Sequence, residues 1–299
     1  FGPRVPMILV EPSATNLVTY SEDFTHSSWL KTDVTVSAAP VAAPDGTMTA
    51  SHVVSTGSNA HLVRLGVPSG THTNSIWART VSGAGSCLFK PTGLGGVLTT
   101  VTDQWQRFEV PSNTHVYAVD FRGGSTLDEI YIWGAQLETG SVATSYIPTS
   151  GSAVTRAADD LAITGSAFTN FFNGSEGTFY IEAIDRDVSG GDHAYIVGQG
   201  TSQFFLYKNN GVTSVYNYDG PLSLLEITGL VSNQLFRAAA SYNSSVKSLS
   251  FNGTTVSGNA RATGGFSDTN ILKIGSGYTN VFSGYFRRII YWPTHSDSL

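Results

Sequence analysis

Cysteine, charged residues and long apolar runs are all scarce in this chain. Its 299 residues include one cysteine, Cys87, which excludes an intrachain disulfide and a cysteine-based zinc or iron site. Charged residues make up 13% of the chain, too few to solvate the outer faces of long helices. No apolar run approaches the roughly 18 residues that a membrane-spanning helix needs, so we expect no membrane insertion.

Basic residues are also too few to suggest nucleic-acid binding. Lysine and arginine number 16 against 22 aspartates and glutamates, and the formal net charge is -6. An acidic chain offers no positive field that would attract a phosphate backbone. We therefore expect no nucleic acid among its partners.

Glycine, threonine, valine and aromatic residues are abundant instead, which favours β-sheets with many turns. Short runs alternate between apolar and polar residues and are separated by turn signals such as Asn209-Asn210-Gly211 and Asn252-Gly253. Many short strands at near-regular spacing predict an all-β fold of antiparallel β-sandwich, or jelly-roll, type. The predicted strands lie at 75–80, 104–110, 115–121, 129–133, 177–184, 195–197, 203–208, 213–218, 235–242, 248–251, 271–274 and 285–292.

A change in composition near the middle of the chain predicts two tandem domains. Residues 144–158 are rich in Ser, Thr, Ala and Pro and lack strand alternation, and four of the five tryptophans precede them. Prolines 3, 6 and 12 indicate an extended segment at the start. The predicted divisions are an extended lead-in at 1–15, a jelly roll at 16–149, a linker at 150–154 and a second β-sandwich at 155–299.

Catalytic machinery is hard to find in the sequence. The acidic cluster from Glu182 to Asp187 is the one candidate on a predicted strand. Retaining glycoside cleavage needs two carboxylates about 5 Å apart, but Glu182 and Asp185 are three residues apart and point to opposite faces of a strand. There is no Gly-x-Ser-x-Gly elbow, and the seven histidines show no metal-ligand spacing. We expect no enzymatic activity and keep a polysaccharide depolymerase as an alternative.

Saccharide binding has better candidates. A sugar ring presents an apolar face and a rim of hydroxyls, so its site needs a flat aromatic ring and nearby polar side chains. Alternation places such residues on common strand faces in both predicted domains. The alternative is that these rings fill the cores or pair across strands, as most aromatic residues do. The candidate ligand-binding residues are Trp77, Arg79, Tyr131, Trp133, Gln136, Tyr216 and Tyr218.

A structural calcium ion is a further possibility. Calcium takes several carboxylate and carbonyl oxygens as ligands, and such ions can pin the strand ends of jelly rolls. Glu22, Asp23, Asp45 and Glu138 would meet if the first and last strands of the first domain pair. The simpler interpretation of Asp45, in Pro44-Asp45-Gly46, is turn formation. No other cofactor is expected.

Several segments resemble known families. Asn16–Phe24, Trp29, Ala43–Thr47 and Trp105–Phe108, with the later segments Trp133–Glu138, Thr144–Thr149 and Val154–Asp159, resemble a jelly-roll module of tailed-phage structural proteins. That module is similar in pattern to carbohydrate-binding modules that recognise xylan and glucan. Gly174–Phe179 and the final Phe286–Pro293 are similar to a laminin-G or concanavalin-like lectin sandwich.

The resemblance implies a protein on the surface of a phage particle: a tail fibre, a tail-tip component or a head decoration that contacts bacterial surface glycan. Its other partners would be virion proteins and further copies of itself, as in a trimer. The acidic motif of laminarinase-type hydrolases is absent from Glu182 to Asp187. The hypothesis is therefore a non-enzymatic, polysaccharide-binding virion protein. A purely structural decoration or connector protein is the main alternative.

Overall fold

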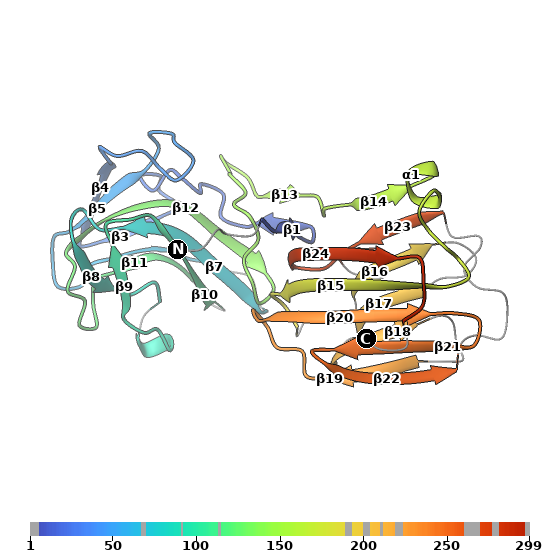
Figure 1. Ribbon diagram of the computed structural model, residues 1–299. Helices are drawn as coiled ribbons and strands as arrows, with labels where there is room; N and C mark the ends of the chain where they lie inside the picture. Colours follow the sequence, from blue (N-terminus) through green and yellow to red (C-terminus); the bar gives the residue numbers. More distant parts are fainter. Residues whose placement is uncertain are drawn as a thin grey trace. The chain divides into compact units, whose positions relative to one another are not determined.

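The computed structural model divides the chain into two compact units. We call Ala14–Arg156 the N-terminal module, and Phe1–Ser13 together with Ala157–Leu299 the C-terminal module. Every sheet described is antiparallel, which confirms the predicted all-β sandwich class (Figure 1). The structure describes residues 6–66, 70–90, 92–112, 115–188, 193–199, 204–209, 212–218, 224–259, 270–276 and 281–296.

The N-terminal module packs a five-stranded sheet against a three-stranded one. Alternate apolar side chains of the two sheets, such as Ile76 and Ile130 from one and Leu62 and Val116 from the other, form its core. The five-stranded order is β10 (Gln106–Ser112), β7 (His72–Arg79), β12 (Glu129–Thr139), β5 (Ser51–Ser55) and β4 (Val34–Ala38). The three-stranded order is β11 (Val116–Asp120), β6 (His61–Arg64) and β3 (Leu30–Thr32).

Smaller elements complete this module. Two strand pairs are β2 (Ala14–Asn16) with β13 (Val154–Arg156), and β8 (Ala84–Cys87) with β9 (Thr99–Thr102). A short 3-10 helix, η1, spans Thr92–Leu94. The register of β12 shifts at Gly134, whose φ of 64° suits glycine. Because of this bulge, Ile130 and Ile132 before it and Ala135 and Leu137 after it all reach the core.

The C-terminal module is a sandwich of two six-stranded sheets. Its core includes Phe179 and Ile181 from one sheet and Tyr195 and Leu206 from the other. The first sheet has the order β1 (Ile8–Val10), β24 (Gly284–Trp292), β15 (Gly177–Asp185), β20 (Leu235–Tyr242), β21 (Val246–Phe251) and β22 (Thr254–Asn259). The second has the order β14 (Leu161–Thr164), β23 (Ile271–Ile274), β16 (His193–Gln199), β17 (Phe204–Asn209), β18 (Val212–Tyr218) and β19 (Leu224–Thr228). A single-turn helix, α1 (Ser166–Thr169), follows β14.

The start of the chain belongs to the C-terminal module, which corrects the predicted lead-in at 1–15. Residues Ile8–Val10 form β1, the edge strand of the first sheet, and pair with β24; Figure 1 shows blue β1 beside red β24. Val10 is fully buried in the core of this module. The Glu11 N–H donates to the Asp159 carboxylate (2.9 Å), and the Glu11 carbonyl accepts from the Asp159 N–H (3.0 Å). Burial of the apolar Val10 side chain and pairing along the open edge of β24 explain why this segment is a strand of the sheet. The prolines had indicated an extended segment outside both domains.

The predicted linker at 150–154 ends in a strand as well. Val154 begins β13, the last strand of the N-terminal module in sequence, which pairs with β2, its first strand. Along the chain, the N-terminal module is therefore an insertion between β1 and the rest of the C-terminal module. Among the described residues, no helix is long and apolar enough to cross a bilayer.

Candidate functional site

The aromatic residues predicted to bind saccharide in the N-terminal module are covered by their own chain. Tyr131 and Trp133 lie on the outward face of the five-stranded sheet, but they are only 6% and 3% exposed. The segment between β4 and β5 packs over them through its alanines 39, 43 and 50. The Trp133 indole also donates a hydrogen bond to Thr49 (2.8 Å). Their ring faces are used for packing, so the prediction that they stack on a sugar is wrong.

The neighbouring candidates Trp77, Arg79 and Gln136 differ in exposure. Trp77 and Arg79 are half-buried; Trp77 joins the covered aromatic cluster and the Arg79 Nε donates to the carbonyl of Thr80. Gln136 is fully buried, and its amide binds the Glu138 carboxylate (2.5 Å) and accepts from the backbone of Ile147 (2.7 Å). The prediction that Gln136 reads sugar hydroxyls is therefore wrong, because its polar atoms hold the strand end in place.

The four carboxylates proposed for calcium do not converge. Glu138 is buried and accepts hydrogen bonds from Gln136 and from the backbone and hydroxyl of Thr144. Asp23 and Asp45 each cap a local turn, at Thr25 and Thr47, and Glu22 accepts a hydrogen bond from Tyr146 (3.0 Å). In the described part of the chain, no group of three His, Cys, Asp or Glu residues is arranged to hold a metal ion. Local hydrogen bonding thus replaces the predicted calcium site.

Tyr216 and Tyr218 were the candidates of the second domain. Their strand, β18, pairs with β17 and places Tyr216 opposite Tyr207 and Tyr218 opposite Phe205. The side chains of both tyrosines lie outside the described residues, so their role in binding stays a prediction.

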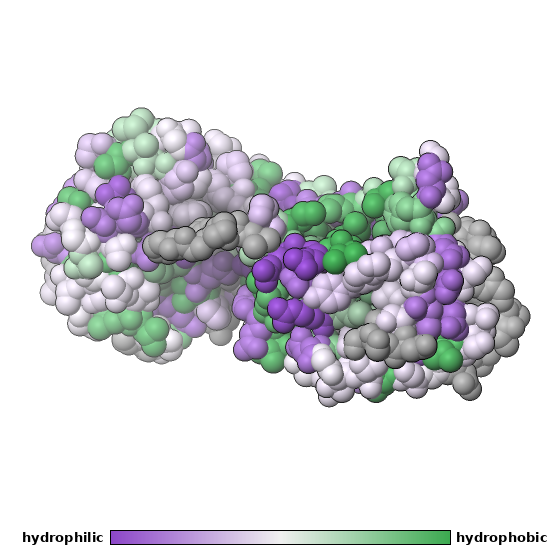
Figure 2. Space-filling model, viewed as in Figure 1, coloured by the Kyte–Doolittle hydropathy of each residue, from purple (hydrophilic) through white to green (hydrophobic). Residues whose placement is uncertain are grey.

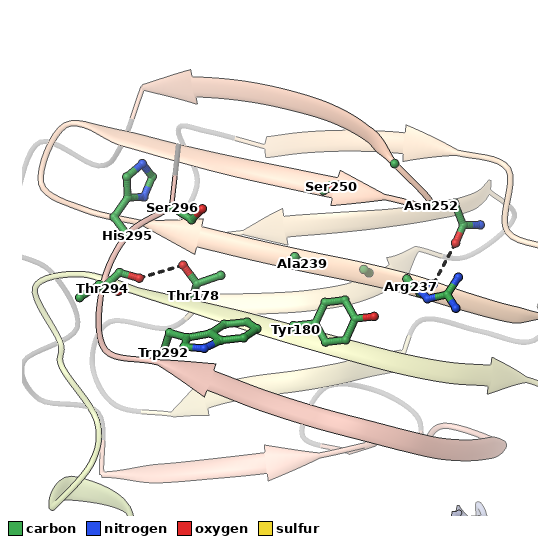
Figure 3. A pocket seen from close by; sticks show the side chains of 12 residues that line it. Thr178, Tyr180, Arg237, Ala239, Ser250, Asn252, Trp292, Thr294, His295 and Ser296 are labelled. Carbon is green, nitrogen blue, oxygen red and sulfur yellow. Dashed lines mark hydrogen bonds between the residues drawn. The ribbon is translucent and has the colours of Figure 1, made fainter. Parts of the chain in front are cut away.

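A cavity of about 550 Å³ lies on the outer face of the six-stranded sheet that contains β15, β20 and β24. Figure 3 shows that side chains from β15, β20 and β24, and from the segment after β24, surround it. The floor is made of small residues, Ala239 on β20 and Ser250 on β21, which face each other in register. Small side chains between larger ones leave a hollow on an otherwise regular sheet face.

Two aromatic rings form one side of this cavity. Tyr180 on β15 and Trp292 at the end of β24 point outward from neighbouring strands, with ring centroids 6.4 Å apart and planes inclined at 59°. Trp292 is 45% exposed, although tryptophan is mostly buried in proteins. Tyr180 is half-buried, and together the two rings beside the hollow floor form a surface on which an apolar ring face can pack.

Polar groups line the other sides. Arg237 and Asn252 close one end, where the backbone N–H of Arg237 donates to the Asn252 side chain (2.8 Å). At the other end the chain after β24 crosses the sheet; Thr178 donates to the carbonyl of Thr294 (2.9 Å) and the Ser241 hydroxyl bonds His295 (2.8 Å). The cavity thus combines an aromatic wall with amide, hydroxyl, imidazole and guanidinium groups.

A buried carboxylate organises the arginine end. Glu182 accepts a hydrogen bond from the Tyr180 hydroxyl (2.8 Å) and forms ion pairs with Arg237 and Arg287. The Tyr180 hydrogen bond is the main cause that lowers the pKa of Glu182, with the arginine charges adding to it and burial opposing. Burial raises the pKa of Tyr180, and the bonded carboxylate raises it further. At neutral pH the site therefore holds an ionised Glu182 and a neutral Tyr180.

The acidic cluster does not form a catalytic carboxylate pair. Glu182 contacts groups on the outer face, whereas Asp185 is fully buried and accepts a hydrogen bond from the core residue Tyr195 (3.0 Å). Side chains alternate between the two faces of a strand, so Glu182 and Asp185, three residues apart, point to opposite faces. Ser241, which touches His295, is also fully buried and so is not placed as a nucleophile.

Sequence reasoning missed this cavity because its residues come from four strands that are distant in the chain. One signal was available: Trp292 lies just before Pro293, and Tyr180 alternates with core residues on a predicted strand.

The space-filling view shows hydrophilic surface gathered where β15 ends and β24 begins (Figure 2).

No protein-family model and no curated protein matches the sequence. Solved structures similar to the chain include mouse laminin α1 chain domains LG4-5 (11% identity, 79% of this chain and 86% of that chain, TM-score 0.35). They also include a galectin from Caenorhabditis elegans (14% identity, 42% and 89%, TM-score 0.29) and an alginate lyase from Klebsiella pneumoniae (10% identity, 47% and 75%, TM-score 0.32). Function is therefore argued from the site itself.

Proposed function

We propose that this chain is a phage virion protein that binds a polysaccharide of the host surface without cleaving it, and that the cavity of the C-terminal module is the binding site. The observation that carries the proposal is the aromatic pair of half-buried Tyr180 and exposed Trp292 beside a floor of small residues. A sugar ring packs its apolar face on such rings while amide and guanidinium groups bind its hydroxyls. The virion assignment rests on the resemblance of the sequence segments described above.

The N-terminal module is structural in this proposal. Its outward aromatic residues, Tyr131 and Trp133, are covered by the segment between β4 and β5. A covered aromatic face stabilises the module but has no ring to offer a ligand. In this proposal the N-terminal module therefore has the purely architectural role that the alternative hypothesis gave to the whole protein.

Binding without cleavage is supported by the placement of the acidic residues. The Glu182 carboxylate is paired with arginines, and Asp185 lies on the other side of the sheet. A shallow polar site gives weak affinity, because little apolar area is buried. Display in many copies, as in a trimer on the particle surface, raises the avidity of such sites.

A binding assay with purified host-surface polysaccharides tests the proposal. We expect Trp292→Ala in the full chain to weaken retention about tenfold, equivalent to about 1.4 kcal/mol. Phe171→Ala is the matched control, because Phe171 is 39% exposed in the same module but is not part of the cavity wall. Trp77→Ala tests the N-terminal module and should bind normally. Equal binding by Trp292→Ala and the unaltered chain would overturn the site.

The same samples test the absence of cleavage. Polysaccharide incubated with the chain should keep its length on size-exclusion chromatography and release no reducing ends. Shortened products that disappear in Glu182→Gln would replace this proposal with the depolymerase alternative.

A further inference from the structure

Three arginines gather around one carboxylate at the closed end of the cavity. Arg237 Nε lies 3.4 Å from one Glu182 oxygen and Arg287 Nε lies 3.5 Å from the other. Arg288 pairs with Glu182 across the two strands. The register of β24 shifts at this point, so that Arg287 is an extra residue; it forms an ion pair with Glu182, and the charge of Arg288 acts on the same carboxylate.

The local charge is therefore opposite in sign to that of the whole chain. One carboxylate neutralises one of three guanidinium groups, whereas the chain carries a formal net charge of -6. Among the described residues, Glu176 is a further acidic side chain near the cavity; it lies at the opposite end, where it accepts a hydrogen bond from the backbone of His295 (3.2 Å). The arginine end of the cavity keeps a surplus of positive charge.

Arg237 is the arginine that faces the cavity. Its side chain is 57% exposed and lines the cavity, and the contact that it makes with Glu182 uses Nε. Its backbone is fixed by Asn252, which donates from its own backbone to the Arg237 carbonyl (2.9 Å) and accepts the Arg237 N–H through its side chain (2.8 Å). The guanidinium of this anchored residue lies at the end of the cavity beyond the Tyr180 hydroxyl, below Asn252 (Figure 3).

We propose that the polysaccharide bound here is acidic: a sugar of the uronic-acid type packs on Tyr180 and Trp292 and places its carboxylate against Arg237. This inference rests on the proposed function and specifies its ligand. The planar fork of a guanidinium matches the two oxygens of a carboxylate, a geometry that lysine cannot provide. Arg237 lies diagonally from Tyr180, one strand across and two residues along, a separation of about 8 Å. One sugar unit with its carboxyl group spans that distance.

A neutral glycan would leave the surplus charge without a partner. Desolvation of an exposed guanidinium costs free energy unless an anion replaces the water it loses. The ligand carboxylate supplies that anion, and Glu182 holds Arg237 in position for it. Binding should accordingly weaken as salt screens the pair.

The experiment compares polygalacturonate with its fully methyl-esterified form, which has the same sugars without the charge. The full chain should bind the acid at least tenfold more tightly than the ester and lose affinity between 50 and 500 mM NaCl. Arg237→Gln should remove this preference, and Arg237→Lys should restore only part of it, because lysine keeps the charge without the fork. Arg79→Gln, in the N-terminal module, is the matched control and should bind as the unaltered chain does.

Three outcomes are distinguishable. Equal binding of acid and ester, both lost in Trp292→Ala, would overturn the acidic ligand and leave the proposed function standing. Equal binding of polygalacturonate and dextran sulfate, unchanged in Arg237→Lys, would show a general anion site and overturn the carboxylate assignment. Retention of neither polygalacturonate, its ester nor any host polysaccharide would overturn the proposed function together with this inference.

Discussion

At the scale of single residues, the most informative side chains are polar groups that the fold has buried. Glu182 is 5% exposed, yet the Tyr180 hydroxyl and three arginines keep its pKa below the usual value. Gln136 and Glu138 are buried together and bind each other. Such groups are tolerated because each has hydrogen-bond or ionic partners, and the loss of one partner leaves the other unsatisfied.

Replacement of Glu182 by glutamine should therefore destabilise the C-terminal module by about 1–3 kcal/mol at pH 7. Because folding lowers the pKa of Glu182, its ionised form stabilises the fold above about pH 4.5, and that contribution is lost as the pH falls through the lower, folded-state value. Urea unfolding of both proteins at pH 7 and pH 3 measures this difference, which should shrink at the acid pH.

The control for this prediction is Glu129→Gln. Glu129 pairs with His52 at 2.8 Å, but its side chain is 41% exposed, so its loss should cost less than about 1 kcal/mol. A Glu182→Gln effect as small as that of Glu129→Gln would contradict the importance of the arginine cluster.

Cys87 should be chemically inert in the folded protein. It is fully buried, and burial, with a contribution from the charge of Asp120, raises the pKa of its thiol to about 12. The thiolate is the reactive form, so a thiol reagent at pH 8 should modify the native chain at least a hundredfold more slowly than the urea-unfolded chain. Fast modification of the native chain, with its circular dichroism spectrum intact, would show that Cys87 is accessible.

At the scale of elements, glycines mark the places where strands approach more closely than any side chain permits. Gly284 begins β24 opposite Asp185, and a Cβ atom there would lie 2.0 Å from the Ile184 carbonyl oxygen. Backbone cannot move aside as a flexible side chain can. This contact sets where β24 pairs with β15, and thus where Trp292 lies at the far end of the strand.

Gly284→Ala should consequently destabilise the C-terminal module by about 1–3 kcal/mol, the usual cost of overpacking. Gly93→Ala is the control, because a Cβ atom at Gly93 would meet nothing within 4 Å. Thermal unfolding followed by near-ultraviolet circular dichroism measures both variants. A Gly284→Ala midpoint equal to that of Gly93→Ala would mean that the strands adjust without cost.

At the scale of the whole molecule, the C-terminal module is built from two separate pieces of chain. The N-terminal module is inserted between them, and its first and last strands, β2 and β13, pair with each other. Paired ends let a module fold on its own and be inserted without disturbing its host. The host module, in contrast, depends on β1, which completes its sheet and contributes Val10 to its core.

Fragments of the chain test this arrangement. Residues 14–156 alone should unfold cooperatively, whereas residues 157–299 alone should be less stable than residues 1–13 joined to 157–299 by a short linker. Burial of Val10 alone accounts for about 2 kcal/mol of this difference. Urea unfolding of the three proteins measures it. Equal stability with and without residues 1–13 would show that β1 contributes nothing.

The sequence by itself determined the fold class. Alternation with a period of two, frequent turn residues and few helix-forming charged residues allow little besides antiparallel sandwiches. It also determined that Glu182 and Asp185 face opposite sides of their strand. These properties are local, because the geometry of one strand fixes which of its residues share a face.

Only the tertiary structure decided which faces are open to solvent. The segment between β4 and β5 covers Tyr131 and Trp133, while the hollow beside Tyr180 and Trp292 stays open because Ala239 and Ser250 are small. The pairing of β1 with β24 likewise joins the two ends of the chain's described part. Alternation along a strand predicts which side chains share a face. Whether that face is covered depends on segments that are distant in the sequence. The candidate binding site could therefore not be located from the sequence alone.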